Sequence, residues 1–360
     1  MSLDDLRANI DKIDNKLIEL INERYNYVKG VGKWKQDNSS AIYVPEREKS
    51  LIDRLQGLNQ GPLQNKTLRA IFREIMSGAI SLEHPVRISF LGPEGTFTEQ
   101  AARAKFGASV SYQARNSIAD IFTDIETGRL DYGCIPVENS TEGAVTHTLD
   151  RLISSSVRIC AELNMRIHHH LMANCELKAI KRIYSHTQVF GQCRNFIQEN
   201  MPNAELIETG STSKATELAA KEPNAAAIGC RLAAEKYTIK IIEENIEDFC
   251  NNTTRFLFIA PQKTKATGDD KTSICIALKD KVGVLYDCLK PFKEGEITLT
   301  MIESRPMKNN NWEYCFFIDV LGHCTDEKIM TALEALKPSC SFIKILGSYP
   351  RCLESSRHAE

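Results

Sequence analysis

A stretch of roughly 30 residues near the start of the chain carries an apolar stripe that is too long for a small domain to bury by itself. The apolar side chains recur at helical spacing: Leu6, Ile10, Ile13, Leu17, Leu20, Val28 and Val31. This pattern predicts a helix from residue 3 to about residue 36, roughly 30 residues and about 45 Å long. We therefore expect an intertwined helical dimer, in which a second copy covers the stripe.

Two shorter helices follow. Pro45 opens the first, "EREKSLIDRLQGL", which stops around Gly57–Gly61, and "LQNKTLRAIFREIMSGAISLE" forms the second and ends before Pro85. Residues 1–84 are therefore expected to form an all-helical domain.

The pattern changes after residue 85. Residues 86–261 alternate between strand and helix, which predicts an α/β domain with parallel strands buried by helices. Residues 262–271 are polar, contain Pro and Gly, and are expected to be a linker. Residues 272–350 follow the order strand-helix-strand-strand-helix-strand, which is typical of a ferredoxin-like α+β domain.

Composition narrows the class of protein. With 360 residues, 42% hydrophobic and 26% charged, the chain is expected to be a soluble protein of two or three domains. Its net charge of −2, without a basic block, argues against nucleic-acid binding. Neither a signal peptide nor a membrane span is indicated. The twelve cysteines occur singly, with no C-x-x-C pair and no Cys/His ligand spacing, and predict reduced thiols in a cytoplasmic protein without a metal site.

Arg24 lies within the apolar stripe of the first helix, where a guanidinium is costly unless an anion meets it. Lys35 follows eleven residues later and returns to nearly the same face, about 16 Å along the axis. These two cations could bracket a small dianion. Arg7 lies about 25 Å before Arg24 and points elsewhere, so it could serve such a pocket only from a second copy.

Three polar clusters follow strands of the α/β domain: Thr96 in a capping box with Glu99, Ser211-Thr212-Ser213, and Glu138 to Gly143. Free N–H groups at helix starts bind anions, so together they predict an anion-binding cleft at the strand ends. Neither a G-x-G-x-x-G motif nor a P-loop is present, which argues against a dinucleotide or ATP. In "NNTTRFLFI", residues 251–259, polar side chains stand where a buried strand begins.

The helical segment resembles the all-helical chorismate mutase domain in "LRANIDKID", "NER", "VGKWK" and "PEREK". The resemblance implies that the chorismate carboxylates are held by Arg24, Lys35, Arg47 and an Arg7 from a second copy. It also implies that Glu48 holds the ring hydroxyl and that Lys35 donates to the breaking ether oxygen. Glu83 matches a position that carries Gln or Glu in relatives, and a carboxylate donates there only when protonated.

The middle segment resembles prephenate dehydratase in "GPEGTFTEQAA", "PVENSTEGAVTHTLDRL", "YSHTQVFGQCRNF", "STSKA" and "NNTTRF". This implies a two-lobed, periplasmic-binding-protein-like domain whose cleft holds the Thr-Arg-Phe motif. Thr254 would act on the leaving ring hydroxyl, with Thr254 favoured over Glu138 as the route of the proton. The other residues implied for this site are Glu138, Asn139, Ser140, Gln192, Arg255 and Phe256, with Thr96, Ser211 and Thr212 for substrate binding.

The C-terminal segment resembles the ACT domain in "GVLYDCLKPF" and "IESRP". The resemblance implies a phenylalanine sensor at the interface of two such domains. The effector residues would be Gly283, Val284, Leu285, Glu303, Ser304, Arg305 and Pro306.

Together the three segments resemble the bifunctional chorismate mutase–prephenate dehydratase family with a C-terminal ACT regulatory domain. This implies conversion of chorismate to prephenate and then to phenylpyruvate, with feedback inhibition by phenylalanine in a homodimer or higher homo-oligomer. No metal or organic cofactor is implied. One alternative is an anion-binding regulatory module with an amino-acid sensor, although no DNA-binding or membrane element accompanies it. A mutase fused to a dehydrogenase would need a glycine-rich nucleotide motif. A dehydratase that prefers arogenate remains open.

Overall fold

The computed structural model describes residues 1–38, 41–279, 281–306 and 314–352. The chain divides into two compact units: unit 1 is Met1–Arg87 with Lys105–Ser111, and unit 2 is Ile88–Ala104 with Tyr112–Glu360. Within the described ranges, no helix is both long and apolar enough to cross a membrane.

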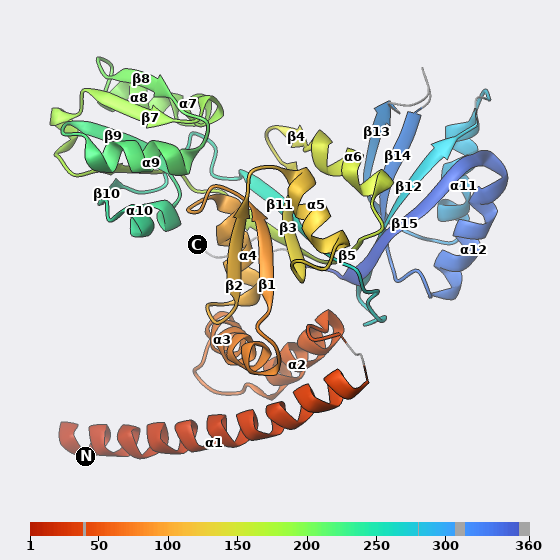
Figure 1. The fold of residues 1–360 in the computed structure, drawn as a ribbon, viewed down its shortest axis with the longest axis horizontal. Coiled ribbons are helices and arrows are strands. Elements are labelled where there is room, and N and C mark those ends of the chain that lie inside the picture. Colours follow the sequence, from red (N-terminus) through yellow and green to blue (C-terminus); the bar gives the residue numbers. More distant parts are fainter. Residues whose placement is uncertain (39–40, 280, 307–313, 353–360) are drawn as a thin grey trace. The chain divides into compact units, whose positions relative to one another are not determined.

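Unit 1 is built on three helices, α1 (Leu3–Asp37), α2 (Pro45–Leu58) and α3 (Asn65–Glu83). Figure 1 shows α1 as one continuous helix, as its apolar period predicts. It packs on α3 over part of its length, and the Tyr25 hydroxyl donates to the Ile75 carbonyl at 3.0 Å. Farther toward the N-terminus the stripe is uncovered in the single chain, and Ile10 and Ile13 are 56% and 57% exposed.

A short segment from later in the chain completes unit 1. In Lys105–Ser111, the Phe106 ring lies 4.9 Å from the ring of Tyr43. The Ser109 amide donates to the Ser77 hydroxyl at 2.9 Å. The sequence did not predict this contribution, because it depends on contacts between residues far apart in the chain.

Unit 2 contains three sheets, and we call the part built on the first sheet lobe 1. Its strand order is β2-β1-β3-β11-β5, with β4 paired to β3. The strands are β1 (Arg87–Leu91), β2 (Ser111–Arg115), β3 (Tyr132–Asn139), β4 (Gly143–Ala144), β5 (Arg158–Arg166) and β11 (Thr253–Ala260). The helices are α4 (Phe97–Phe106), α5 (Ile118–Glu126) and α6 (Thr146–Ser154). The expected parallel arrangement holds for β1 and β3, but β11 runs antiparallel to both β3 and β5.

The second sheet, which we call lobe 2, is inserted between β5 and β11. Its order is β10-β6-β9-β7-β8. The strands are β6 (His170–Ala173), β7 (Arg182–Ser185), β8 (Glu205–Glu208), β9 (Ala225–Gly229) and β10 (Ile241–Glu243). The helices are α7 (Thr187–Gln192), α8 (Arg194–Asn200), α9 (Thr212–Lys221) and α10 (Arg231–Tyr237), with a 3₁₀ turn at Leu177–Ala179. The chain thus enters lobe 2 after β5 and returns through β11, which explains the direction of β11.

The C-terminal sheet is antiparallel, in the order β13-β14-β12-β15. Its elements are β12 (Asp270–Leu278), α11 (Val284–Glu294), β13 (Leu299–Pro306), β14 (Tyr314–Leu321), α12 (Glu327–Leu336), a 3₁₀ turn at Lys337–Ser339, and β15 (Cys340–Pro350). This is the expected strand-helix-strand-strand-helix-strand order. Strand β12 begins two residues earlier than residue 272, inside the stretch expected to be a linker.

The two faces of the C-terminal sheet pack against different partners. Ile274 and Ile318 face the core that includes α11 and α12. Phe317 and Leu346 share a core with lobe 1, which includes Leu257 of β11. Gly347 permits this approach, because a Cβ there would lie 2.2 Å from the Ile159 carbonyl oxygen. The strand that carries the Thr-Arg-Phe motif is thus in direct contact with the C-terminal sheet.

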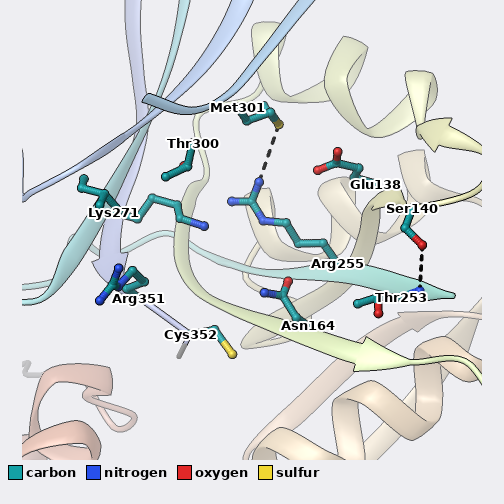
Figure 2. A pocket seen from close by; sticks show the side chains of 11 residues that line it. Glu138, Ser140, Asn164, Thr253, Arg255, Lys271, Thr300, Met301, Arg351 and Cys352 are labelled. Carbon is teal, nitrogen blue, oxygen red and sulfur yellow. Dashed lines mark hydrogen bonds between the residues drawn. The ribbon is translucent and has the colours of Figure 1, made fainter. Parts of the chain in front are cut away.

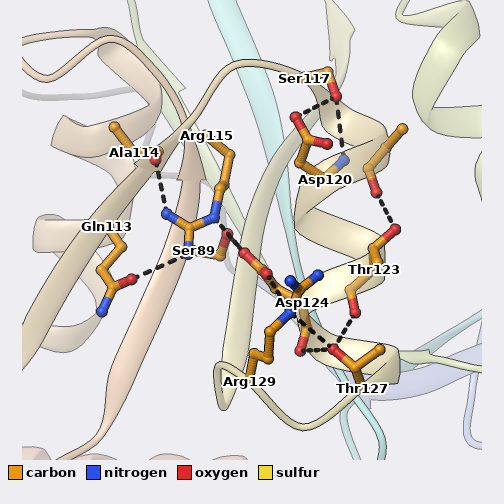
Figure 3. A network of polar contacts seen from close by, with 11 residues as sticks. Ser89, Gln113, Ala114, Arg115, Ser117, Asp120, Thr123, Asp124, Thr127 and Arg129 are labelled. Carbon is orange, nitrogen blue, oxygen red and sulfur yellow. Dashed lines mark hydrogen bonds and ion pairs between the residues drawn. The ribbon is translucent and has the colours of Figure 1, made fainter.

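A buried carboxylate holds the outer part of lobe 1 together (Figure 3). Asp124 of α5 is 3% exposed and pairs with Arg115 of β2. It also pairs with Arg129 at 3.2 Å and accepts from the Ser89 hydroxyl of β1 at 3.4 Å. The network ties α5 to both strands, and a buried carboxylate with these partners is a structural feature.

Candidate functional sites

In unit 1, Lys35 and Glu83 form a close ion pair. Their Nζ and Oε2 atoms lie 2.6 Å apart, and the side chains are 15% and 8% exposed. Lys35 also donates to the Ile42 carbonyl at 2.7 Å. The ammonium that the resemblance assigns to the ether oxygen is therefore held between two acceptors.

Glu48 has two partners. The Tyr43 hydroxyl donates to its Oε2 atom at 2.5 Å, and the Lys105 ammonium lies 3.1 Å from the same oxygen. Lys105 was not predicted for this site, because it belongs to the segment that joins unit 1 from later in the chain.

Arg24 carries a buried nitrogen atom that is available to a ligand. Its Nη1 atom is buried and has no hydrogen-bond partner among the described residues. Arg7 and Arg47 are exposed. A buried guanidinium nitrogen without an acceptor is costly, so this atom is suited to an anionic ligand.

In lobe 1, Thr254 and Asn139 lie opposite each other on β11 and β3. The Asn139 Nδ2 atom donates to Thr254 Oγ1 and to Asn252 Oδ1, both at 2.8 Å. Cross-strand pairing thus brings together two residues that are 115 positions apart in the chain.

The polar chain continues toward lobe 2. Asn252 Nδ2 donates to Gln192 Oε1 at 3.1 Å, and the same oxygen lies 2.8 Å from Nε2 of His169. The Phe97 ring meets the His169 ring edge-on, with the centroids 5.4 Å apart. The Ile167 amide donates to the Asn252 carbonyl at 2.8 Å, so the two segments that cross between the lobes meet here. A position between two lobes is typical of a substrate cleft.

Backbone amides set the direction of these hydrogen bonds. The N–H groups of Thr141 and Glu142 donate to Asn139 Oδ1 at 2.9 and 3.0 Å, so Nδ2 faces Thr254. Thr254 Oγ1 must then accept, which leaves its own proton free to be donated elsewhere. By the same logic Asn252 Oδ1 accepts, its Nδ2 donates to Gln192 Oε1, and His169 carries its proton on Nε2.

His169 is a buried and neutral member of this chain. Burial lowers its pKa, against the opposing effects of the hydrogen bond to Gln192 and of the Glu247 carboxylate. Its Nδ1 atom has no hydrogen-bond partner among the described residues. Neither His169 nor Asn252 was among the predicted site residues, although Asn252 stands in the quoted "NNTTRF" stretch.

Three predicted residues do not join this chain. Arg255 lies opposite Glu138 in the register of β11 and β3, and both side chains are on the face opposite to Thr254. Ser140 exchanges hydrogen bonds with the backbone of Thr253 at 2.9 Å. A cavity of about 490 Å³ lies on this face, where Figure 2 shows Arg255 pointing toward Met301. It is lined by Glu138, Ser140, Asn164, Thr253, Arg255, Lys271, Thr300, Met301, Leu321, Arg351 and Cys352.

Two of the predicted substrate-binding residues, Thr96 and Ser211, make hydrogen bonds at the starts of helices α4 and α9. Glu99 accepts from the Gly95 amide at 2.7 Å, and Thr96 donates to the Leu91 carbonyl at 3.1 Å. Ser211 caps α9 by accepting from the Lys214 amide at 3.0 Å. Thr212 and Phe256 are buried.

The predicted effector residues lie on α11 and β13. Gly283 caps α11 with a φ of 79°, and Val284 and Leu285 begin that helix. Glu303 is half-buried, and Ser304 and Pro306 are exposed. Arg305 points toward α6, where its Nη2 atom lies 3.2 Å from Asp150 Oδ1.

Comparisons with known proteins identify the family of the chain. Residues 6–84 match the chorismate mutase type II family, and residues 88–264 match the prephenate dehydratase family. The bifunctional chorismate mutase/prephenate dehydratase of Aquifex aeolicus is 42% identical over 356 residues, covering 98% of each chain. The enzyme of the same name from Pseudomonas aeruginosa is 41% identical over 355 residues, covering 97% of each chain.

Two solved structures resemble unit 2. The prephenate dehydratase of Arthrobacter aurescens in complex with L-Phe is 34% identical, with a TM-score of 0.68 over 74% of this chain and 90% of that chain. The prephenate dehydratase of Staphylococcus aureus is 26% identical, with a TM-score of 0.66 over 73% of this chain and 100% of that chain. The chain therefore belongs to the bifunctional chorismate mutase/prephenate dehydratase family and has both activities.

Proposed function

We propose that Thr254 donates a hydrogen bond to the ring hydroxyl that leaves prephenate, in the polar chain that links Asn139 to His169. The observation that supports this role is the direction of the hydrogen bonds. Asn139 donates to Thr254 Oγ1, so the Thr254 proton is free for the substrate.

The reaction balances with one proton. The ring hydroxyl takes it up and leaves as water, while the ring carboxylate departs as carbon dioxide and leaves its electron pair in the ring, which becomes aromatic. Partial negative charge develops on Thr254 Oγ1 as its proton moves, and the Asn139 N–H stabilises that charge. Water returns the proton to Thr254.

The mutase site is proposed to grip chorismate rather than attack it, because the rearrangement needs no nucleophile. The unpartnered Arg24 Nη1 atom is suited to a carboxylate, and Lys35 to the ether oxygen. Glu48, Glu83 and Arg47 would complete the site, with Arg7 supplied by a second copy of the chain. The uncovered stripe of α1 supports such a dimer.

Regulation by phenylalanine is part of the proposal. The Arthrobacter aurescens relative is described in complex with L-Phe. In this chain the effector would bind at the start of α11 and the end of β13, at an interface between the C-terminal domains of two copies of the chain. The residues proposed for it are Gly283, Val284, Leu285, Glu303, Ser304, Arg305 and Pro306.

The test uses the full chain with Thr254→Val, which keeps the shape of the side chain and removes the hydroxyl. Phenylpyruvate formation should fall by about 10²–10⁴-fold, while chorismate is still consumed and prephenate accumulates. Thr254→Ser, which keeps the hydroxyl, should retain most of the activity. A Val variant with the wild-type rate would exclude this role. Assays with arogenate beside prephenate decide which of the two the dehydratase prefers.

A further inference from the structure

Arg255 follows Thr254 directly, but its guanidinium lies among residues of another sheet. Its Nε atom is 2.9 Å from Glu162 Oε2 on β5. Its Nη1 atom is 2.5 Å from Asp319 Oδ2 on β14, and its Nη2 atom donates to the Tyr349 hydroxyl on β15 at 2.9 Å. Its Nη1 atom also lies 3.6 Å from the sulfur of Met301 on β13, so one side chain of the Thr254 strand contacts three strands of the C-terminal sheet.

The network around Arg255 is buried and balanced in charge. Lys271 of β12 pairs with Glu162 Oε2 at 2.9 Å. The two cations are 10% and 11% exposed, and Glu162 and Asp319 are 0% and 2% exposed. Ser273 donates to Asp319 Oδ1 at 2.5 Å. Two cations thus face two carboxylates. These charges and their hydroxyl partners come from β5 and β11 of lobe 1 and from β12, β14 and β15 of the C-terminal sheet.

Thr254 and Arg255 share a peptide unit, so the two side chains cannot move independently along the strand. Thr254 faces Asn139, and Arg255 faces the C-terminal sheet on the opposite side. A displacement of Asp319 relative to lobe 1 must either break a buried ion pair or shift the start of β11. Breaking a buried pair is strongly unfavourable, so the strand is the element that yields.

We propose that Arg255 is a positioning residue that transmits the placement of the C-terminal sheet, through Asp319, to Thr254. This inference rests on the proposed role of Thr254. A shift of β11 lengthens the hydrogen bond from Asn139 to Thr254 and misaligns the proton donor. Arg255 itself does not touch the substrate.

The decisive variant is the double substitution Arg255→Met with Asp319→Leu. It removes one cation and one anion together and leaves Lys271 paired with Glu162. Replacing a buried pair by apolar residues is often neutral for stability. We expect an unchanged melting temperature and mutase rate, an almost unchanged KM for prephenate, and a dehydratase kcat lowered at least about tenfold, since small misplacements of catalytic groups are costly.

Lys344→Met is the matched control. Lys344 also crosses from the C-terminal sheet to lobe 1, where it donates to the Leu152 and Ile153 carbonyls at 2.8 Å, but neither belongs to β11. This variant should keep the wild-type dehydratase kcat. An equal loss of kcat in the control and in the double variant would mean that the contact between the C-terminal sheet and lobe 1 matters only for folding, and would overturn the inference.

Tyr349→Phe provides a second, milder test in case the double variant does not fold. It removes the hydrogen bonds of this hydroxyl to Arg255 and to Ser273 and keeps all four charges, and we expect a two- to fivefold lower kcat with little change in KM. Wild-type kcat in whichever of these variants folds overturns the proposal, provided that Thr254→Val is inactive. If Thr254→Val is itself active, the proposed function of Thr254 is what fails.

Discussion

The two candidate active sites are built from different chemistry. In unit 1 the candidate residues are charged: Lys35 pairs with Glu83, Lys105 pairs with Glu48, and Arg24 has a nitrogen with no partner in the part of the chain that the structure describes. Between the lobes of unit 2 the polar chain from Asn139 to His169 consists of neutral amides, a hydroxyl and an imidazole, and the Glu142 carboxylate accepts from Gln192 at 3.3 Å at its edge.

The difference follows from what each reaction needs. A pericyclic rearrangement needs its dianionic substrate to be held in one shape, and fixed charges supply that grip. A dehydration needs a proton presented from one direction. Backbone amides fix the orientation of Asn139, and the neutral groups that follow it in the chain take matching donor and acceptor roles. The direction of proton donation is thereby set mainly by hydrogen bonds, not by fixed charges.

The largest effect is expected from Asn139→Asp, which keeps the shape and reverses the hydrogen bond to Thr254. The new carboxylate only accepts, so the Thr254 proton turns toward it and away from the substrate. Dehydratase kcat should fall by about 10²–10³-fold, as when one oriented donor is removed from an active site. Phenylpyruvate formation from prephenate measures this, and Asn200→Asp, at an exposed position at the end of α8, is the control. Full activity in Asn139→Asp would contradict the inferred direction.

A smaller effect is expected in the other site from Arg24→Gln. A hydrogen bond between charged groups contributes about 1.5–3 kcal/mol, so mutase kcat/KM should fall about ten- to a hundredfold. Dehydration of added prephenate should stay unchanged. The comparison variant is Lys29→Gln, on the same helix and exposed. Equal mutase kcat/KM in the two variants would show that Arg24 is not part of the mutase site.

Lys105→Met tests whether the segment that joins unit 1 from later in the chain supports the mutase. The ion pair with Glu48 is 3.1 Å long and its side chains are 20% and 22% exposed. Pairs of this kind contribute about 0.2–1 kcal/mol, so we expect the mutase KM to rise by up to about fivefold. Lys105→Arg, which keeps the positive charge, should have a mutase KM close to that of the wild type. An unchanged KM would confine Lys105 to a structural role.

The smallest effect concerns pH. The pKa of His169 is lowered by burial, so the unfolded chain takes up a proton as the pH falls below the ordinary value of about 6.5, while the folded chain does not. Stability is therefore full above this value and decreases below it. Melting temperatures at pH 7.5 and 5.5 should differ more in the wild type than in His169→Gln. An identical pH response in the variant would assign the effect to other groups.

Local patterns in the sequence predicted the elements well. The apolar period predicted the first helix from residue 3 to about 36, and the structure has it at Leu3–Asp37. The run "RFLFI" lies within β11 at Thr253–Ala260. The helix carries one apolar period along its length, and the strand is a continuous apolar run that is buried on both faces.

Contacts between distant residues limited the prediction of the sites. His169 stands in a run of three histidines that predicts nothing by itself, and its role depends on Gln192 of lobe 2. The position of Arg255 could have been inferred, because consecutive residues of a strand face opposite sides. A resemblance that treats Thr254, Arg255 and Phe256 as one motif hides this alternation.

The insertion of lobe 2 also determines when the dehydratase can become complete during synthesis. Strand β11 lies between β3 and β5, yet the ribosome adds it only after all of lobe 2. Chains fold from the N-terminus as they emerge. Until β11 arrives, the facing edges of β3 and β5 are unpaired, and exposed strand edges invite aggregation. The nascent chain therefore passes through its most vulnerable state while lobe 2 is being made, and Thr254 reaches Asn139 only when that state ends.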